Sequence, residues 1–274
     1  MYSSLRPLAF RIEPERAHAL TLNLMRLVGT ITPLRWLLSL WFKPPYRPVE
    51  AFGLKFINPV GLAAGYDKDG IAVSGLACLG FGHIEVGTVT PKAQPGNERP
   101  RLFRLVEDEA LINRMGFPGR GAEFVANQLQ RARLKDVILG INIGKNKDTP
   151  IEEAAQDYLM VMRALYSFAD YFAINVSSPN TVGLRQLQAR QALEALLAVL
   201  LEERRALSTR FGRKTPLLVK LAPDLNEAEL EDALGVLLDA HLDGVIATNT
   251  TLEREGLRSR NARESGGLSG TPLR

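Results

Sequence analysis

The stretch Val137-Ile-Leu-Gly-Ile-Asn-Ile-Gly-Lys-Asn146 decides the fold of this 274-residue chain. It is almost continuously apolar up to Ile143 and then polar, which is typical of a strand buried on both faces of a parallel sheet. Similar runs occur at Val60–Ala64, Ile84–Val89, Tyr171–Val176, Leu217–Leu221 and Gly244–Thr248. Amphipathic runs that predict helices lie between them, at Ile71–Leu79, Ala122–Ala132, Ile151–Phe168, Leu184–Arg210 and Glu227–His241. The alternation predicts an α/β fold in which helices cover a parallel sheet.

One insertion interrupts the alternation between the second and third predicted strands. Arg101–Val106 and Ala110–Asn113 have strand-like patterns and flank the acidic turn Glu107-Asp-Glu109. This arrangement predicts a β-hairpin that forms a lid or side wall of the domain.

Residues 1–48 differ in pattern from residues 49–274, which hold the alternating strands and helices. Pro14–Val28 and Pro33–Phe42 are predicted helices, separated by a break at Gly29 and Thr30, and Thr32 is expected to cap the second helix. A proline-rich linker ends the segment. We therefore expect an N-terminal helical extension followed by one larger domain.

The second of these helices carries both tryptophans of the chain, Trp36 and Trp41. Its apolar surface runs almost all round, and Arg35, Lys43 and Arg47 are the nearby cations. A helical hairpin packed on the domain explains this pattern. An anchor lying in a membrane surface, with tryptophans in lipid and cations at headgroups, explains it equally well.

Composition excludes several classes of protein. The hydrophobic share of 46% argues against disorder, and the net charge of +4 comes with no basic, aromatic-rich run for nucleic acid. Cys78 is the single cysteine, so no disulfide framework or cysteine metal cluster is expected, and we predict that it is buried. The three scattered histidines favour neither a metal site nor a Ser-His-Asp triad. We see no signal peptide and no apolar run of about 18 residues, and the composition suits a reducing, intracellular compartment.

The residues after each predicted strand are rich in Asn, Thr, Ser and Gly, and they include Lys68 and Lys220. Ligands of parallel α/β folds bind at the carboxyl ends of the strands. An Asn amide both donates and accepts, so several convergent Asn suit a flat ligand with N–H and C=O edges, such as a pyrimidine or an isoalloxazine ring. Each of these residues alone is more often a turn former. The same types after six successive strands favour a ligand site.

Redox chemistry at such a site requires a cofactor, because no side chain here accepts a hydride. The first strand is not followed by Gly-x-Gly-x-x-Gly, which argues against a dinucleotide fold. Lys220 lies inside a strand, where it could stabilise negative charge on a reduced flavin. The alternative is a lysine at the edge of the core that pairs with a carboxylate such as Asp224.

Nine ordered motifs carry a family resemblance. Among them are Asn58-Pro-Val-Gly-Leu-Ala-Ala-Gly-Tyr-Asp-Lys-Asp-Gly70, Gly140-Ile-Asn-Ile-Gly-Lys-Asn146, Ile174-Asn-Val-Ser-Ser-Pro-Asn-Thr181, Val219-Lys-Leu-Ala-Pro-Asp224 and Gly266-Gly-Leu-Ser-Gly270. With these motifs the chain resembles the class 2, quinone-linked dihydroorotate dehydrogenases from about residue 13 to its end. The resemblance implies a (β/α)8 TIM barrel, of which six units are present here, with FMN at its top.

The resemblance also implies the residues of the site. Cofactor contacts would be Ala64, Gly65, Tyr66, Asp67, Lys68, Thr88, Asn142, Asn175, Lys220, Thr248 and Gly270. Substrate contacts would be Lys68, Asn113, Arg114, Met115, Gly116, Phe117, Asn175, Asn180, Asn249 and Thr250. Ser178 would be the catalytic base, helped by a relay through Thr181 or water. His18 and Arg104 would contact the polar end of a quinone.

The implied activity is oxidation of dihydroorotate to orotate in de novo pyrimidine synthesis, with electrons passing through FMN to a membrane quinone. The N-terminal extension belongs to the quinone-linked branch, so the resemblance favours the membrane interpretation. It places the protein at the cytoplasmic face of the inner membrane, bound peripherally through its N-terminal helices.

Two departures from the family pattern modify these expectations. Pro118 follows Phe117 where the family has Asn, so the loop is expected to differ in shape. The family continues with two more strand–helix units that hold the FMN phosphate, and these are not found in residues 1–274. From this we expect an open barrel with a weak phosphate anchor. An inactive membrane-associating fragment and another FMN-barrel oxidoreductase are the alternative functions.

Overall fold

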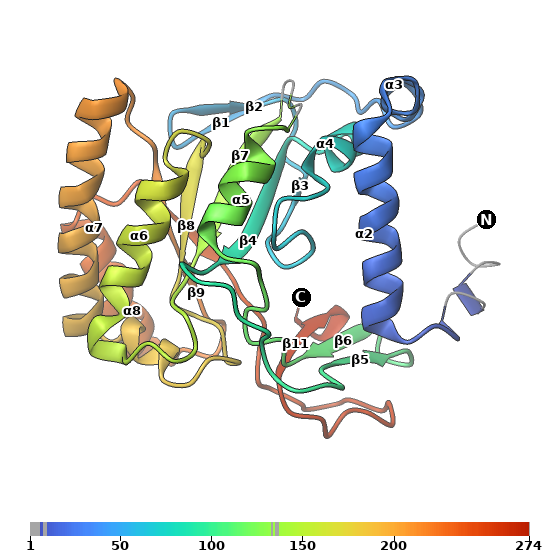
Figure 1. Cartoon of the computed structure of the whole chain (residues 1–274). Coiled ribbons are helices and arrows are strands. Elements are labelled where there is room, and N and C mark those ends of the chain that lie inside the picture. The colour runs from blue at the N-terminus through green and yellow to red at the C-terminus, as the bar shows by residue number, and fades with distance from the viewer. Residues whose placement is uncertain (1–5, 8–9, 133, 135–136, 274) are drawn as a thin grey trace.

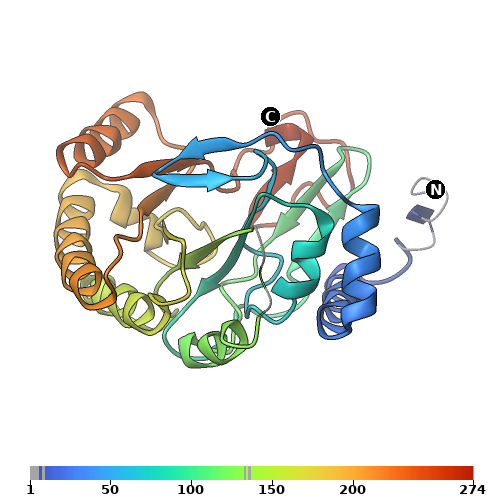
Figure 2. The ribbon, with the colours of Figure 1, turned by 90° about the horizontal axis from the view of Figure 1, so that it is seen from above.

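The computed structural model describes residues 6–7, 10–132, 134 and 137–273. Its centre is a six-stranded sheet of order β10-β9-β8-β7-β4-β3 in which all neighbours are parallel. The strands are β3 (Gly61–Leu62), β4 (His83–Val89), β7 (Ile138–Ile143), β8 (Tyr171–Asn175), β9 (Leu217–Leu221) and β10 (Gly244–Ala247). The sheet curls into part of a barrel with helices along its outer face (Figures 1 and 2). The prediction of a TIM-type barrel with six of its units is confirmed.

Helices follow the strands as predicted, with some breaks. The outer helices are α4 (Val73–Leu76), α5 (Ala122–Leu129), α6 (Ala154–Leu165), α7 (Arg190–Phe211) and α8 (Glu227–Asp239), and the single 3-10 turns are η1 (Ala77–Leu79), η2 (Ile151–Glu153), η3 (Leu184–Gln188) and η4 (Thr271–Leu273). The single helix predicted over 184–210 is wrong, because Ala189 is extended and separates η3 from α7. A capping box between Asn226 and Glu229 begins α8.

Alternation along the strands divides the sheet into a core face and an inner face. Ile84 and Val86 of β4 are fully buried beneath the helices, together with Ile141 and Ile143 of β7. Because successive side chains of a strand point to opposite faces, the residues between them face the barrel axis. The inner face therefore carries the few polar side chains that lie within the apolar runs of the sequence.

The predicted hairpin is present as β5 (Leu102–Leu105) and β6 (Ala110–Asn113). A third strand, β11 (Gly267–Gly270), pairs antiparallel with β6 and lies beside it in Figure 1. The sequence predicted only a Gly-rich motif there. A second hairpin, β1 (Val49–Ala51) and β2 (Leu54–Phe56), was also missed, although Phe52 and Gly53 both have the positive φ of a tight turn.

The N-terminal extension consists of α2 (Pro14–Thr30) and α3 (Thr32–Trp41). Helix α2 runs through Gly29 and Thr30, so the predicted break comes only at Ile31. The cap predicted at Thr32 is wrong, since Ile31 precedes α3 and makes no side-chain capping bond. Parts of the predicted extension and domain lie outside the described residues. They include residues 1–5 and 8–9 of the extension and residue 274 of the domain.

Helix α2 packs closely on the barrel, whereas α3 lies against α2 and η1 and keeps most of its surface exposed. A Cβ atom at Gly75 of α4 would lie 1.9 Å from the Met25 carbonyl oxygen, so the two backbones approach directly. No residue of α3 is buried, and Trp36 and Trp41 are 66% and 78% exposed. Cys78 is buried, as predicted. Among the described residues, no helix has both the length and the apolar character needed to cross a membrane.

Candidate active site

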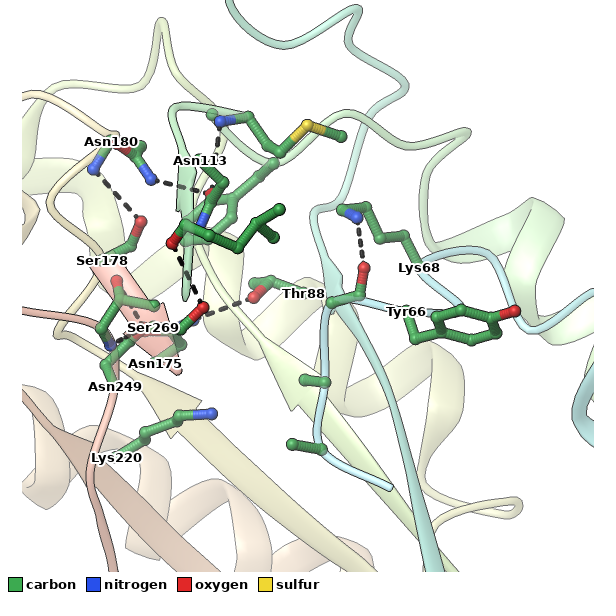
Figure 3. A pocket seen from close by; sticks show the side chains of 18 of the residues that line it. Tyr66, Lys68, Thr88, Asn113, Asn175, Ser178, Asn180, Lys220, Asn249 and Ser269 are labelled. Atoms are coloured by element: carbon green, nitrogen blue, oxygen red, sulfur yellow. Dashed lines mark hydrogen bonds between the residues drawn. The ribbon is translucent and has the colours of Figure 1, made fainter. Parts of the chain in front are cut away.

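A cavity of about 600 Å³ opens at the carboxyl ends of the strands. Predicted cofactor contacts that line it are Ala64, Gly65, Tyr66, Lys68, Thr88, Asn175, Lys220 and Thr248. Predicted substrate contacts that line it, besides Lys68 and Asn175, are Asn113, Met115, Gly116, Phe117, Asn180, Asn249 and Thr250. Ser178 lies on the same wall, and Figure 3 shows it beside Asn180 and above Asn249. One cavity thus gathers residues that are scattered over most of the sequence.

Four predicted contacts do not line this cavity. Asp67 is buried and accepts hydrogen bonds from the backbone N–H groups of Ile71 and Ala72, at 3.0 and 2.7 Å, so it holds the turn before α4. Arg114 forms an ion pair with Glu264 at 2.7 Å. The others are Asn142, which lies in the barrel interior, and Gly270, which lines a separate cavity of about 420 Å³.

Lys220 extends from β9 into the cavity and is only 8% exposed. Among the described residues its ammonium has no hydrogen-bond or ion-pair partner. The alternative interpretation, a pair with Asp224, is wrong, because Asp224 forms an ion pair with Arg185 at 2.8 Å and accepts a hydrogen bond from Thr251. A buried, unpaired cation is costly, and it favours an anionic ligand at this position.

Ser178 follows β8 and is 5% exposed. Its Oγ accepts a hydrogen bond from the Asn180 N–H at 3.3 Å. The Asn180 amide donates to Asn113 Oδ1 at 3.2 Å, which fastens the serine loop to the hairpin. Within the described residues, no side-chain hydrogen bond joins Ser178 to Thr181, so the expected relay through that threonine is not formed. The serine hydroxyl is left facing the cavity.

Lys68 and His18 close the side of the cavity next to α2. Lys68 Nζ donates to the Gly65 carbonyl, and burial lowers the pKa of Lys68 to about 8, with the positive charge of Arg101 as a smaller cause. His18 Nε2 lies 2.7 Å from the Tyr66 carbonyl oxygen, and burial lowers the pKa of His18. His18, Tyr66 and Lys68 also line a second cavity of about 860 Å³ along α2.

A family model described as dihydroorotate dehydrogenase matches residues 47–274. The chain belongs to the dihydroorotate dehydrogenase family. It is 51% identical over 274 residues to the dihydroorotate dehydrogenase (quinone) of Xanthomonas campestris pv. campestris (strain B100), covering all of this chain and 77% of that protein. It is 52% identical over 278 residues to the protein of the same name from Burkholderia pseudomallei (strain 668), covering 80% of it.

Solved structures of the family agree with the fold. The crystal structure of DHODH from Eimeria tenella in complex with ferulenol is 40% identical, with a TM-score of 0.81 over 94% of this chain and 73% of that chain. The ligand-free DHODH of Eimeria tenella is 41% identical, with a TM-score of 0.77 over 91% of this chain and 75% of that one.

Within this family fold, the two predicted quinone contacts are not brought into one cavity. His18 lines the main cavity, whereas Arg104 lines the separate cavity near Gly270. The Arg104 guanidinium donates to the Ile12 carbonyl at 2.7 Å and lies 4.7 Å from the ring centre of Phe10. It therefore ties the residues before α2 to the hairpin.

Several cavity residues were not predicted from the sequence. Leu102 and Leu111 come from the hairpin, and Ser269 and Leu273 come from β11 and the turn after it. The alternation of the hairpin strands could have indicated the two leucines. Ser269 lies inside the quoted Gly-rich motif, but only the pairing of β11 with β6 brings it to the cavity, and that contact spans over a hundred residues of sequence.

Proposed function

We propose that the protein oxidises dihydroorotate to orotate in de novo pyrimidine synthesis and passes the electrons through FMN to a membrane quinone. The observation that carries the proposal is the cavity at the strand ends, where a buried serine and a buried lysine with no partner among the described residues face one space. The relatives named dihydroorotate dehydrogenase (quinone) support the same substrate and acceptor.

The residues present fit FMN. Lys220 supplies a buried positive charge with no described partner, which matches a ring that becomes anionic on reduction. Gly65 has a φ of +111° and open space where a Cβ would stand, so its backbone can approach a flat ring. Thr88 and Asn175 offer hydrogen bonds from the floor of the cavity. When bound, FMN supplies the acceptor for the hydride that leaves the substrate.

The substrate carries a carboxylate and a ring proton that must be removed. Lys68 supplies a positive charge for the carboxylate at one side of the cavity, and the amides of Asn113, Asn180 and Asn249 are placed to bind ring N–H and C=O groups. Ser178 Oγ accepts the proton from ring carbon C5. Serine is a weak base, so the proton must pass on to water as it arrives.

Turnover with different acceptors tests the proposed function. The purified protein should oxidise dihydroorotate with a lipophilic quinone and should give little turnover with fumarate or NAD⁺. Turnover with fumarate or NAD⁺ but not with quinone would contradict the assignment of the acceptor. A flavin-loaded protein that oxidises no dihydroorotate with any acceptor would contradict the assignment of the substrate.

Orotate affinity should depend on pH through Lys68. Because its pKa is lowered to about 8, the ammonium loses its proton above that pH and no longer attracts the carboxylate. We expect the Kd for orotate to be constant below the pKa and to rise about tenfold per pH unit above it. Measuring the Kd for orotate between about pH 7 and about pH 9 tests this, because that interval spans the lowered pKa of Lys68.

Lys68→Arg is the matched control for this prediction. Its guanidinium stays charged throughout the range, so the rise in Kd should disappear even if the absolute affinity changes. A Kd for orotate that is equally flat in the unmodified protein would show that Lys68 does not bind the carboxylate.

The exposed face of α3 supports peripheral membrane binding, which we propose takes place at the cytoplasmic face of the inner membrane. Its two tryptophans are the largest apolar groups on that surface. Arg35 and Lys43 lie close to them in sequence and can meet anionic headgroups. The cavity along α2, which reaches His18, would then offer a quinone a path from the membrane to the active site.

Replacing Trp36 and Trp41 together by serine should release the protein from anionic vesicles, because α3 loses the two exposed rings that would insert into lipid. We expect the bound fraction in co-sedimentation to fall by about tenfold or more. Leu238→Ser is the matched control, since Leu238 is 74% exposed on α8, a separate helix. Equal binding of the double variant and the control would contradict anchoring through α3.

A further inference from the structure

A row of polar side chains, of which the first three are buried, crosses the inner face of the sheet beneath the cavity. It begins at Glu85 of β4, which is 4% exposed, and continues through Asn142 of β7 and Asn175 of β8 to Asn249 after β10. Asn142 Nδ2 donates to Glu85 Oε1 at 2.9 Å. Asn175 Nδ2 donates to Asn142 Oδ1 at 3.1 Å, and Asn249 Nδ2 donates to Asn175 Oδ1 at 3.3 Å. Every amide in the row thus donates towards Glu85.

The carboxylate fixes this direction at its first step. An ionised carboxylate only accepts hydrogen bonds, so the Asn142 amide must turn its Nδ2 towards Glu85 and its Oδ1 away. The opposite orientation would place two oxygens against each other in a buried site. It would cost the lost hydrogen bond and the desolvation penalty of the unpaired oxygens. Glu85 is the one member of the row that cannot reverse its role.

The other oxygen of Glu85 is occupied by Tyr171. The Tyr171 hydroxyl donates to Glu85 Oε2 at 3.0 Å. Burial raises the pKa of Tyr171, and the negative charge of Glu85 raises it further, so the phenol remains a donor. His83 lies nearby on the same face, and burial lowers its pKa, which leaves it neutral. The carboxylate therefore has no described cation to neutralise it and is held by hydrogen bonds alone.

The direction set at Asn142 passes to the groups that line the cavity. Asn142 Oδ1 accepts from Thr88 Oγ1 and from Asn175 Nδ2, and Thr88 Oγ1 accepts from Asn175 Nδ2 at 2.9 Å. Asn175 Oδ1 is then turned towards Asn249 Nδ2, and Asn249 Oδ1 towards the backbone N–H of Thr250 at 2.8 Å. Figure 3 shows the bonds that join Thr88, Asn175 and Asn249 at the floor of the cavity.

We propose that Glu85 is a positioning residue that sets the donor and acceptor pattern of the cavity floor through this row of amides. It touches neither ligand, since it does not line the cavity. Its role is to ensure that Thr88, Asn175 and Asn249 present the pattern that a ring with C=O and N–H edges requires. This inference rests on the proposed function, in which a flavin and a pyrimidine share that floor.

Glu85→Gln tests the role of the carboxylate. The introduced amide can present either oxygen or nitrogen to Asn142, so both directions of the row become comparable in energy. We expect the Kd values for FMN and for orotate each to rise by about tenfold or more, as loss of a charge-assisted hydrogen bond implies. Fluorescence quenching and equilibrium binding measure the two values, and neither depends on turnover.

Two further variants separate direction from general packing. Tyr171→Phe removes the other hydrogen bond of Glu85 but keeps the charge and the direction, so it should change both Kd values less than about threefold. Adding Asn142→Asp to Glu85→Gln restores a fixed direction, because the introduced glutamine amide then donates to a carboxylate that accepts from Thr88 and Asn175. We expect this second change to recover most of the lost affinity.

The outcomes distinguish the inference from the proposed function. If the unmodified protein binds neither FMN nor orotate, the proposed function fails. If it binds both, and Glu85→Gln binds them equally well, the inference fails while the function stands. Equal losses in Glu85→Gln and Tyr171→Phe, or no recovery in the double variant at matched Tm, would show that Glu85 contributes only to packing.

Discussion

Replacing Ser178 by alanine should leave FMN bound and slow flavin reduction by dihydroorotate by about two orders of magnitude or more, as loss of a general base implies. The serine is 5% exposed, lies on the cavity wall and accepts only the Asn180 N–H among the described groups. Its removal takes away the proton acceptor but little of the packing. Stopped-flow mixing under anaerobic conditions measures the reduction rate directly.

Ser177→Ala is the matched control for this prediction. Ser177 is the adjacent residue and is fully buried, but its hydroxyl bonds to Asn175 and Asn249 and does not line the cavity. We expect a much smaller loss of rate from this change. If both variants reduced flavin at the rate of the unmodified protein, Ser178 would not be the base.

Replacing Lys220 by methionine should change stability and flavin affinity in opposite directions. The side chain is buried with no described partner, so removing its charge relieves a desolvation cost in the flavin-free protein. The Tm of that form should rise, by about 2–4 °C for each kcal/mol relieved. The Kd for FMN should rise by roughly tenfold to a hundredfold, since the ring loses its charged partner.

Lys145→Met provides the opposite case, in the loop that follows β7. Lys145 is 2% exposed, but its ammonium donates to the carbonyl oxygens of Thr149 at 2.8 Å and Asn146 at 3.2 Å. Loss of a satisfied buried lysine leaves those acceptors unpaired, so its Tm should fall. A fall in the Tm of flavin-free Lys220→Met of similar size would mean that Lys220 stabilises the fold and is not reserved for a ligand.

The sequence was sufficient to predict those parts of the fold that depend on local pattern. Apolar runs such as 137–143 and 171–176 correspond to β7 and β8, because a strand covered on both faces must be apolar along most of its length. The hairpin after Arg101 was predicted from two strand-like runs that flank an acidic turn and are close in sequence. The site was located because the carboxyl ends of parallel strands share one edge.

Features that depend on contacts between distant residues could not be predicted in this way. The pairing of β11 with β6 adds Ser269 to the cavity, and nothing near Ser269 in the sequence indicates it. The partner of Asp224 is Arg185 and not Lys220, which only the three-dimensional arrangement decides. Glu85 lies between two core residues of β4, inside a run that is otherwise apolar. The sequence pattern therefore did not predict its position beneath the cavity.

Anaerobic mixing of the FMN-loaded protein with dihydroorotate tests whether the substrate reduces the bound flavin. We expect the visible absorbance of the flavin to bleach in one fast phase and a lipophilic quinone then to restore it. Orotate should appear in an amount equal to the flavin reduced. A loaded, folded protein whose flavin stays oxidised in the presence of excess dihydroorotate would contradict the proposed function.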